Sequence, residues 1–191
     1  MNSRARTVTQ LAPMARRRGG HTAAVPQYAG MSDGAPSDAV RRILERYRRL
    51  AVVGLSPKAD RPSHRAMVHM QANGYAITPV NPTCEQVLGN PCVASLTAAA
   101  AEGPLEIVDI FRRPEDVPPI VDEAIALGAK VIWMQLGISE PESAQRARDA
   151  GLEVVENRCT KMEHCRFFGG LNVVGLATGV VGSRRMDVFR A

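Results

Sequence analysis

The sequence contains no apolar stretch long enough to cross a membrane, because charged residues or prolines interrupt every hydrophobic segment. It has only four cysteines, and it has neither a secretory hydrophobic region nor a Cys-x-x-Cys pair. These absences argue against a membrane protein and against a secreted domain held together by disulfides. We therefore expect a cytoplasmic protein whose cysteines are reduced thiols.

Acidic residues are missing from the first 30 positions, which hold five arginines: Arg4, Arg6, Arg16, Arg17 and Arg18. This segment accounts for the formal net charge of +5, since basic and acidic residues are equal in number in the rest of the chain. A nucleic-acid-binding face is therefore not indicated. Residues 1–36 also lack hydrophobic periodicity, which predicts a disordered basic tail. The alternatives are a translation start at Met31 and an organelle transit peptide.

From residue 37 onward, short apolar segments alternate with segments of helical periodicity. Strands are predicted at 50–55, 76–80, 105–111, 131–134 and 152–156, and helices at 37–49, 63–73, 118–127 and 140–150. Ser37 or Asp38 is the expected cap of the first helix, and Gly74, Gly128 and Gly151 are the expected stops of the others. Residues 83–103 are less regular, with a short strand near 92–94 and a short Ala-rich helix.

This alternation predicts an α/β fold, namely a doubly wound, Rossmann-like and mostly parallel sheet. A chain of 191 residues suits one such domain with a substantial core. We place the domain at residues 37–167, between the basic tail and a Gly-rich C-terminal extension at 168–191.

In sheets of this kind, ligands bind beyond the carboxyl ends of the strands. The first strand is followed by a loop from Gly54 to Ser63 that leads into a helix, whose N-terminal amides and dipole attract phosphate. Ser56, Lys58 and Arg61 add donors within this loop. The sequence therefore predicts a phosphate site here, and the alternative is an ordinary turn in which Ser63 caps the helix.

The dinucleotide fingerprint Gly-x-Gly-x-x-Gly is incomplete, because Gly54 is followed two positions later by Ser56. The second strand ends in Val80-Asn81-Pro82, without the acidic residue that an NAD site places there for the ribose. An NAD(P)-linked oxidoreductase is therefore an alternative that the sequence disfavours.

The third strand ends in Phe111-Arg112-Arg113, and arginine at this position suits a phosphate. We favour Arg112, while the alternative is that Phe111 packs in the core and the arginines pair with the acidic residues that follow. The fourth strand leads into Gln135 and Gly137, which supply an amide and a backbone that a ligand can approach closely. Gln135 as a solvated turn residue is the alternative.

Several of these segments, in this order and spacing, resemble the CoA-binding protein family, which is similar to the nucleotide-binding domain of the succinyl-CoA synthetase α subunit. The resemblance rests on Val53-Gly54-x-Ser56, Arg61-Pro62-Ser63, Gly74-Tyr75, Pro79-Val80-Asn81-Pro82, Gly89, Asp109-Ile110-Phe111-Arg112, Trp133-x-Gln135-x-Gly137-Ile138 and Asn157-Arg158-Cys159.

The resemblance implies that coenzyme A or an acyl-CoA lies across the four strand ends, with its phosphates at the loop from Gly54 to Ser63. It adds Asn81, Pro82 and Ile138 to the candidate binding residues. The region that holds the synthetase's catalytic histidine has no counterpart in this chain, so we expect binding of a small molecule and not an enzyme. Whether the chain forms a homo-oligomer is left open.

The segment Cys159–Cys165, which also contains a glutamate and a histidine, suggests a thiol-based redox or metal sensor. The spacing opposes a zinc site, since the other two cysteines, Cys84 and Cys92, do not form a closely spaced pair. We therefore expect no metal ligands and treat the sensor as an alternative function.

Deleting residues 1–30 should leave the melting temperature and the affinity for CoA nearly unchanged, because this segment contributes charge but no expected core residue. Thermal unfolding and calorimetry of the full-length and shortened chains would measure both quantities. A clear loss of melting temperature in the shortened chain would contradict the prediction.

Overall fold

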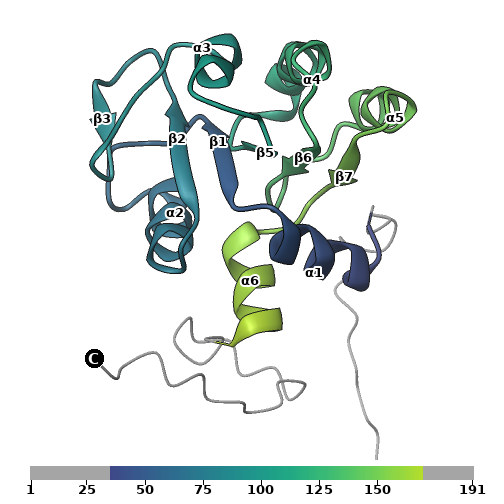
Figure 1. Cartoon of the computed structure of the whole chain (residues 1–191), viewed down its shortest axis with the longest axis horizontal. Coiled ribbons are helices and arrows are strands. Elements are labelled where there is room, and N and C mark those ends of the chain that lie inside the picture. Colours follow the sequence, from purple (N-terminus) through teal and green to yellow (C-terminus); the bar gives the residue numbers. More distant parts are fainter. Residues whose placement is uncertain (1–34, 170–191) are drawn as a thin grey trace, which may run out of the picture. The chain divides into compact units, whose positions relative to one another are not determined.

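The computed structural model describes residues 35–169, and its main sheet is built from the short apolar segments of the sequence. Five parallel strands lie in the order β2 (Ala76–Val80), β1 (Arg49–Val53), β5 (Ile107–Ile110), β6 (Val131–Met134) and β7 (Glu153–Val155). Every residue of β5 and β6 is buried, because helices cover both faces of the sheet (Figure 1). The predicted doubly wound α/β fold is confirmed.

Within the described residues, helices lie on both faces of the sheet (Figure 1). One face carries α1 (Ser37–Arg46), α2 (Pro62–Ala72) and α6 (Thr160–Phe168), and the other carries α3 (Leu96–Ala101), α4 (Val117–Ala126) and α5 (Pro141–Asp149). Alternate side chains of β6 serve the two layers: Ile132 and Met134 pack toward α4, while Val131 and Trp133 pack in the opposite layer. No helix of the described chain is long and apolar enough to span a membrane.

The strand order reverses at β1, which lies between β2 and β5. A parallel bridge between Val80 and Val93 continues the sheet beyond β2, with Asn81 N donating to Val93 O at 2.9 Å. Val93 therefore occupies the place of the third strand in the Rossmann order, reduced here to one bridge. The switch in strand order lies between β1 and β5, where a ligand crevice is expected.

Several predicted boundaries hold. The strands at 76–80 and 131–134 have the predicted bounds, and Gly74, Gly128 and Gly151 follow α2, α4 and α5 with positive φ angles. The short Ala-rich helix is α3. The irregular segment before it contains a hairpin of β3 (Gln86–Val87) and β4 (Asn90–Pro91).

Other expectations were wrong. The cap of α1 is Pro36, with no capping side chain, so neither Ser37 nor Asp38 has that role. Helix α6 was not predicted at all. Ala35, which we had assigned to the tail, is buried at 6 % exposure. Residues 1–34 of the basic tail and 170–191 of the C-terminal extension lie outside the described residues.

Gly54 ends β1 where the chain passes very close to the loop after β5. Its φ is +86°, and a Cβ atom there would lie 2.8 Å from the carbonyl oxygen of Phe111 and 3.1 Å from Nε of Arg112. A side chain at this position therefore meets a backbone atom that cannot move away as a flexible side chain would. The glycine is required by the fold itself, before any ligand is considered.

Gly54→Ala should destabilise the protein more than Gly128→Ala. Both glycines have positive φ, which costs alanine about 1–2 kcal/mol, but a Cβ at Gly128 would meet nothing within 4 Å. Urea unfolding of the two variants and the unmodified chain would measure the difference. Equal losses of unfolding free energy would show that the close approach of Gly54 to Phe111 adds no cost to that of the positive φ angle.

Candidate functional site

The loops after β1, β5 and β6 and the start of α6 surround a cavity of about 800 Å³, here called the main cavity. It lies beyond the carboxyl ends of the strands, as the topology predicts. Nine of the predicted binding residues line it: Gly54, Ser56, Arg61, Ser63, Phe111, Arg112, Gln135, Gly137 and Ile138. The sequence therefore located this cavity, although the ligand contacts themselves stay predictions.

A smaller space of about 350 Å³, here called the cation hollow, adjoins the main cavity and shares Gly54, Ser56, Arg61 and Arg112 with it. Lys58, Arg61 and Arg112 line this hollow, and all three are exposed. Within residues 35–169 their side chains form no ion pair or hydrogen bond, and no acidic side chain lines the hollow. Three cations thus converge without a neutralising partner.

The first turn of α2 borders both spaces. Arg61 is the N-cap and Pro62 the first helical residue, so Ser63 does not cap the helix as the alternative interpretation held. Its hydroxyl oxygen instead accepts a hydrogen bond from Ser56 N at 3.1 Å, and Ser56 Oγ accepts one from Lys58 N at 3.2 Å. The first turn contains no acidic residue, so the positive end of the helix dipole is left for an anion.

Asn81 and Pro82 lie where the second strand ends. The side chain of Asn81 is buried and hydrogen-bonded through both its nitrogen and its oxygen, because Nδ2 donates to Leu55 O at 2.8 Å and Oδ1 accepts from the Thr83 hydroxyl at 2.8 Å. Asn81 lines the cation hollow, and Pro82 lines a third space of about 360 Å³ that also touches Arg112. The amide of Asn81 therefore shapes the hollow by joining two loops.

The two arginines after β5 have different surroundings. Arg113 pairs with Glu115 at 3.2 Å and with Asp116 at 3.6 Å, as the alternative interpretation held for it. Arg112 lies beside Gly54 and lines all three spaces. Both arginines line the main cavity, and the preference for Arg112 as a ligand contact stays a prediction.

Gln135 is not the solvated turn residue that we had kept as an alternative, since it is 3 % exposed. Its Nε2 donates to Asp109 Oδ1 at 2.7 Å and also contacts the hydroxyl of Thr160, which in turn donates to Asp109 Oδ2 at 2.9 Å. Gln135 Oε1 accepts from Thr160 N, at the start of α6. The side chain thus fastens α6 beneath the main cavity.

Asp109 is completely buried, and this burial raises the pKa of its carboxyl to about 7, while the hydrogen bonds from Gln135 and Thr160 oppose the rise. Sequence reasoning missed this residue as part of the site. A single aspartate inside an apolar strand was the signal available. Its partners could not be identified from the sequence because they lie 26 and 51 residues away.

The far wall of the main cavity is largely apolar. Leu136 is 60 % exposed at its rim, and Ile138, Cys159 and Met162 complete it. The sequence did not predict Cys159 and Met162 as lining residues, because α6 itself was not predicted. Cys159 precedes this helix and Met162 lies within it. Gly137 N donates to Asn157 Oδ1 at 2.7 Å, which fixes this loop. Burial raises the pKa of the Cys159 thiol, so it is protonated at neutral pH.

Among residues 35–169, no group of three or more His, Cys, Asp or Glu side chains is arranged to hold a metal ion. The main cavity is lined by none of the carboxylates or imidazoles of this part of the chain. The site therefore has two ends: the cation hollow at the N-terminus of α2, and the apolar wall of the main cavity beside α6.

Asp109→Asn should change how stability depends on pH. The ordinary pKa of this carboxyl is 3.8, and the folded value is about 7. Between these values the unfolded chain has released the proton while the folded chain keeps it, so the carboxyl's contribution to stability falls as pH rises through this window. The slope is at most about 1.4 kcal/mol per pH unit, and asparagine abolishes it.

Urea unfolding of both proteins at several pH values between 4 and 8 would test this, since the other titrating groups contribute equally and cancel in the difference. Unfolding free energies that run parallel over the range would show that Asp109 does not retain its proton in the folded state.

Comparisons with known proteins agree with this geometry. A family model described as a CoA binding domain matches residues 48–165. The chain is 42 % identical over 130 residues to the uncharacterized protein YneT of Bacillus subtilis (strain 168), covering 68 % of this chain and 95 % of YneT. A solved structure of a hypothetical protein from Pyrococcus horikoshii OT3 is 39 % identical with a TM-score of 0.67, covering 72 % and 95 % of the two chains.

A second solved structure, from Thermus thermophilus, is 32 % identical with a TM-score of 0.64 and covers 69 % of this chain and 98 % of the other. The family model covers more than half of the chain, and it spans the loops that line the main cavity. The chain therefore belongs to the CoA-binding domain family.

Proposed function

We propose that this protein binds coenzyme A or an acyl-CoA, with the phosphates in the cation hollow and the pantetheine arm along the main cavity. The observation that carries the proposal is the convergence of Lys58, Arg61 and Arg112, unpaired within the described chain, at the N-terminus of α2. Unpaired cations and free helix amides favour a polyanion, and membership of the family points to CoA.

The main cavity supports the same assignment. Its walls include Phe111, Leu136, Ile138 and Met162, against which a long chain with few charges can pack. NAD carries no such arm and lacks the phosphate monoester of CoA. It would therefore make fewer contacts than CoA with both the apolar wall of the main cavity and the cation hollow. The second strand is followed by Asn81, whose amide already forms hydrogen bonds within the protein, and not by an acidic residue that could bind a ribose.

We propose binding without catalysis. A general acid or base needs a titratable group within reach of the ligand, and the described lining of the main cavity has no carboxylate or imidazole. Cys159, a nucleophile by type, has a pKa raised by burial, which disfavours the reactive thiolate. We also propose that the protein works in the cytoplasm, since none of its four cysteines is joined in a disulfide in the structure.

Calorimetry should show that CoA binds more tightly than dephospho-CoA, which lacks the phosphate monoester. NAD should bind more weakly than either, because it lacks both this phosphate and the pantetheine arm. Lys58→Ala and Arg61→Ala should each weaken CoA binding about tenfold at low salt, or ~1.4 kcal/mol, and less at high salt. Acetyl-CoA incubated with the protein should be recovered intact.

Lys130→Ala is the matched control. Lys130 is exposed and directly precedes β6, so it lies at the opposite edge of the sheet from the cation hollow. This variant should bind CoA like the unmodified protein. Binding of NAD but not CoA would overturn the proposed ligand, and equal losses in all three variants would overturn the location.

A further inference from the structure

The hairpin β3–β4 holds two cysteines against each other. Its turn consists of Leu88 and Gly89, both with positive φ (54° and 77°), which is the two-residue turn that matches the twist of antiparallel strands. This turn fixes the register, in which Val87 pairs with Asn90 and Gln86 with Pro91. The ladder continues one step further, as Cys92 N donates to Glu85 O at 2.8 Å.

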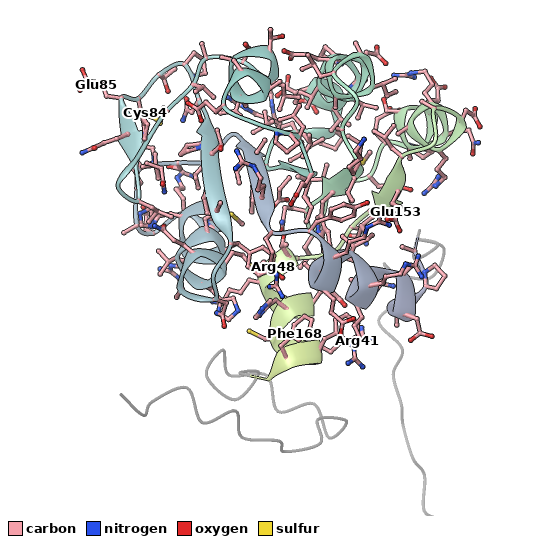
Figure 2. The ribbon with its side chains drawn as sticks, viewed as in Figure 1. Arg41, Arg48, Cys84, Glu85, Glu153 and Phe168 are labelled. Atoms are coloured by element: carbon pink, nitrogen blue, oxygen red, sulfur yellow. The ribbon has the colours of Figure 1, made fainter. Side chains whose placement is uncertain are left out.

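Cys92 directly follows β4 and lies opposite Glu85, and Cys84 is the residue before Glu85, so the two cysteines are diagonal neighbours at the open end of the hairpin. Their sulfur atoms are 2.8 Å apart, and both residues are half-buried. Figure 2 shows Cys84 and Glu85 beside β3, at the outer edge of the molecule and far from α6. The other two cysteines belong to that distant region, where Cys165 Sγ faces Nε2 of His69 at 3.5 Å.

We propose that Cys84 and Cys92 form a reversible intramolecular disulfide by exchange with a low-molecular-weight disulfide. One cysteine thiolate attacks a sulfur of the small disulfide, forming a mixed disulfide and releasing one small thiol. The second cysteine then attacks the protein-bound sulfur, which closes the Cys84–Cys92 bond and releases the second small thiol. Two electrons pass from the protein to the small disulfide, and the two protein S–H protons leave with the released thiols.

The geometry favours closure over a lasting mixed disulfide. The second thiol already lies next to the first, so the two sulfur atoms need to approach by less than about 1 Å for the bond to close. The new bond also closes only a short loop whose ends the turn holds together. Burial and the neighbouring Cys84 raise the pKa of Cys92 to about 12, so exchange should be slow at neutral pH and faster in alkali.

The bond would also stiffen the edge of the cation hollow. Cys84 directly follows Thr83, which lines the hollow and donates hydrogen bonds to Asn81 Oδ1. Cys84 Sγ itself lies 3.9 Å from Asn81 O. The disulfide therefore ties the loop after β2 to the far strand of the hairpin. The proposal itself does not depend on which ligand the hollow holds.

The test uses the full chain, reduced, freed of reductant and incubated with oxidised glutathione at pH 7 and pH 9. Free thiols counted after denaturation should fall from four to two. The intact mass should drop by two hydrogen atoms, and peptide mapping after alkylation should join Cys84 to Cys92. A dithiol reductant should restore all four thiols, and oxidation should be faster at pH 9.

Cys84→Ser and Cys92→Ser should each retain all three remaining thiols or carry glutathione on the single remaining hairpin cysteine, without an internal bond. Cys159→Ser is the control, and it should still lose two thiols, from three to one. Retention of four thiols under excess oxidised glutathione would overturn the proposal. So would a bond mapped to another pair, a linked dimer, or glutathione held separately on both hairpin cysteines of the unmodified chain.

Discussion

Parallel pairing forces the ends of β1, β2 and β5 to the same edge of the sheet at the same level. Val53 is in register with Val80 on one side and with Ile110 on the other, so the chain leaves all three strands side by side. The loop after β1 then has to pass between its neighbours, which explains why Gly54 approaches the backbone of Phe111 so closely. Each cavity described here is bounded by loops that this pairing brings together.

Many arginines of the domain are paired with acidic residues, as Arg146 is with Asp122 and Arg148 with Glu156. Arg46 and Arg65 form no ion pair within the described chain, but they do not line the cation hollow. Lys58, Arg61 and Arg112 lie near one another without such partners in the described chain. Exposure to solvent keeps their mutual repulsion small, but it also means that they add little to stability. Their convergence is therefore not required by the fold, and under the proposed function it serves an anionic ligand.

Features that depend on residues close together in the sequence could be predicted, whereas features that depend on contacts between distant residues could not. Continuous apolar segments gave the strands, and the loop Gly54–Ser63 gave the cationic end of the site. Helix α6 was missed because its apolar residues do not form a clear periodic face and because it begins without a capping side chain. The Cys84–Cys92 contact could not be predicted because the turn of its hairpin contains Leu88, a residue that rarely adopts positive φ, and because Cys92 lies opposite Glu85 and not opposite Cys84.

The missed helix and the missed carboxyl are two parts of one arrangement. Asp109 lies beneath the first turn of α6, where the positive end of the helix dipole and the hydroxyl of Thr160 favour its charged form, while burial favours the neutral form. Gln135 joins the two, and it also lines the main cavity. Trp133 lies two residues before Gln135 in the sequence. Its Nε1 donates to Arg158 O at 2.7 Å, which fixes the segment just before α6.

These contacts hold the helix that supplies Met162 to the apolar wall, so the shape of that wall depends on polar groups that no ligand needs to touch. A carboxyl buried at this point is therefore best understood as a constraint on the position of α6, because removing its partners would leave an unpaired polar group inside the protein. The apolar end of the site is thus positioned by buried hydrogen bonds, whereas its cationic end is positioned by the sheet.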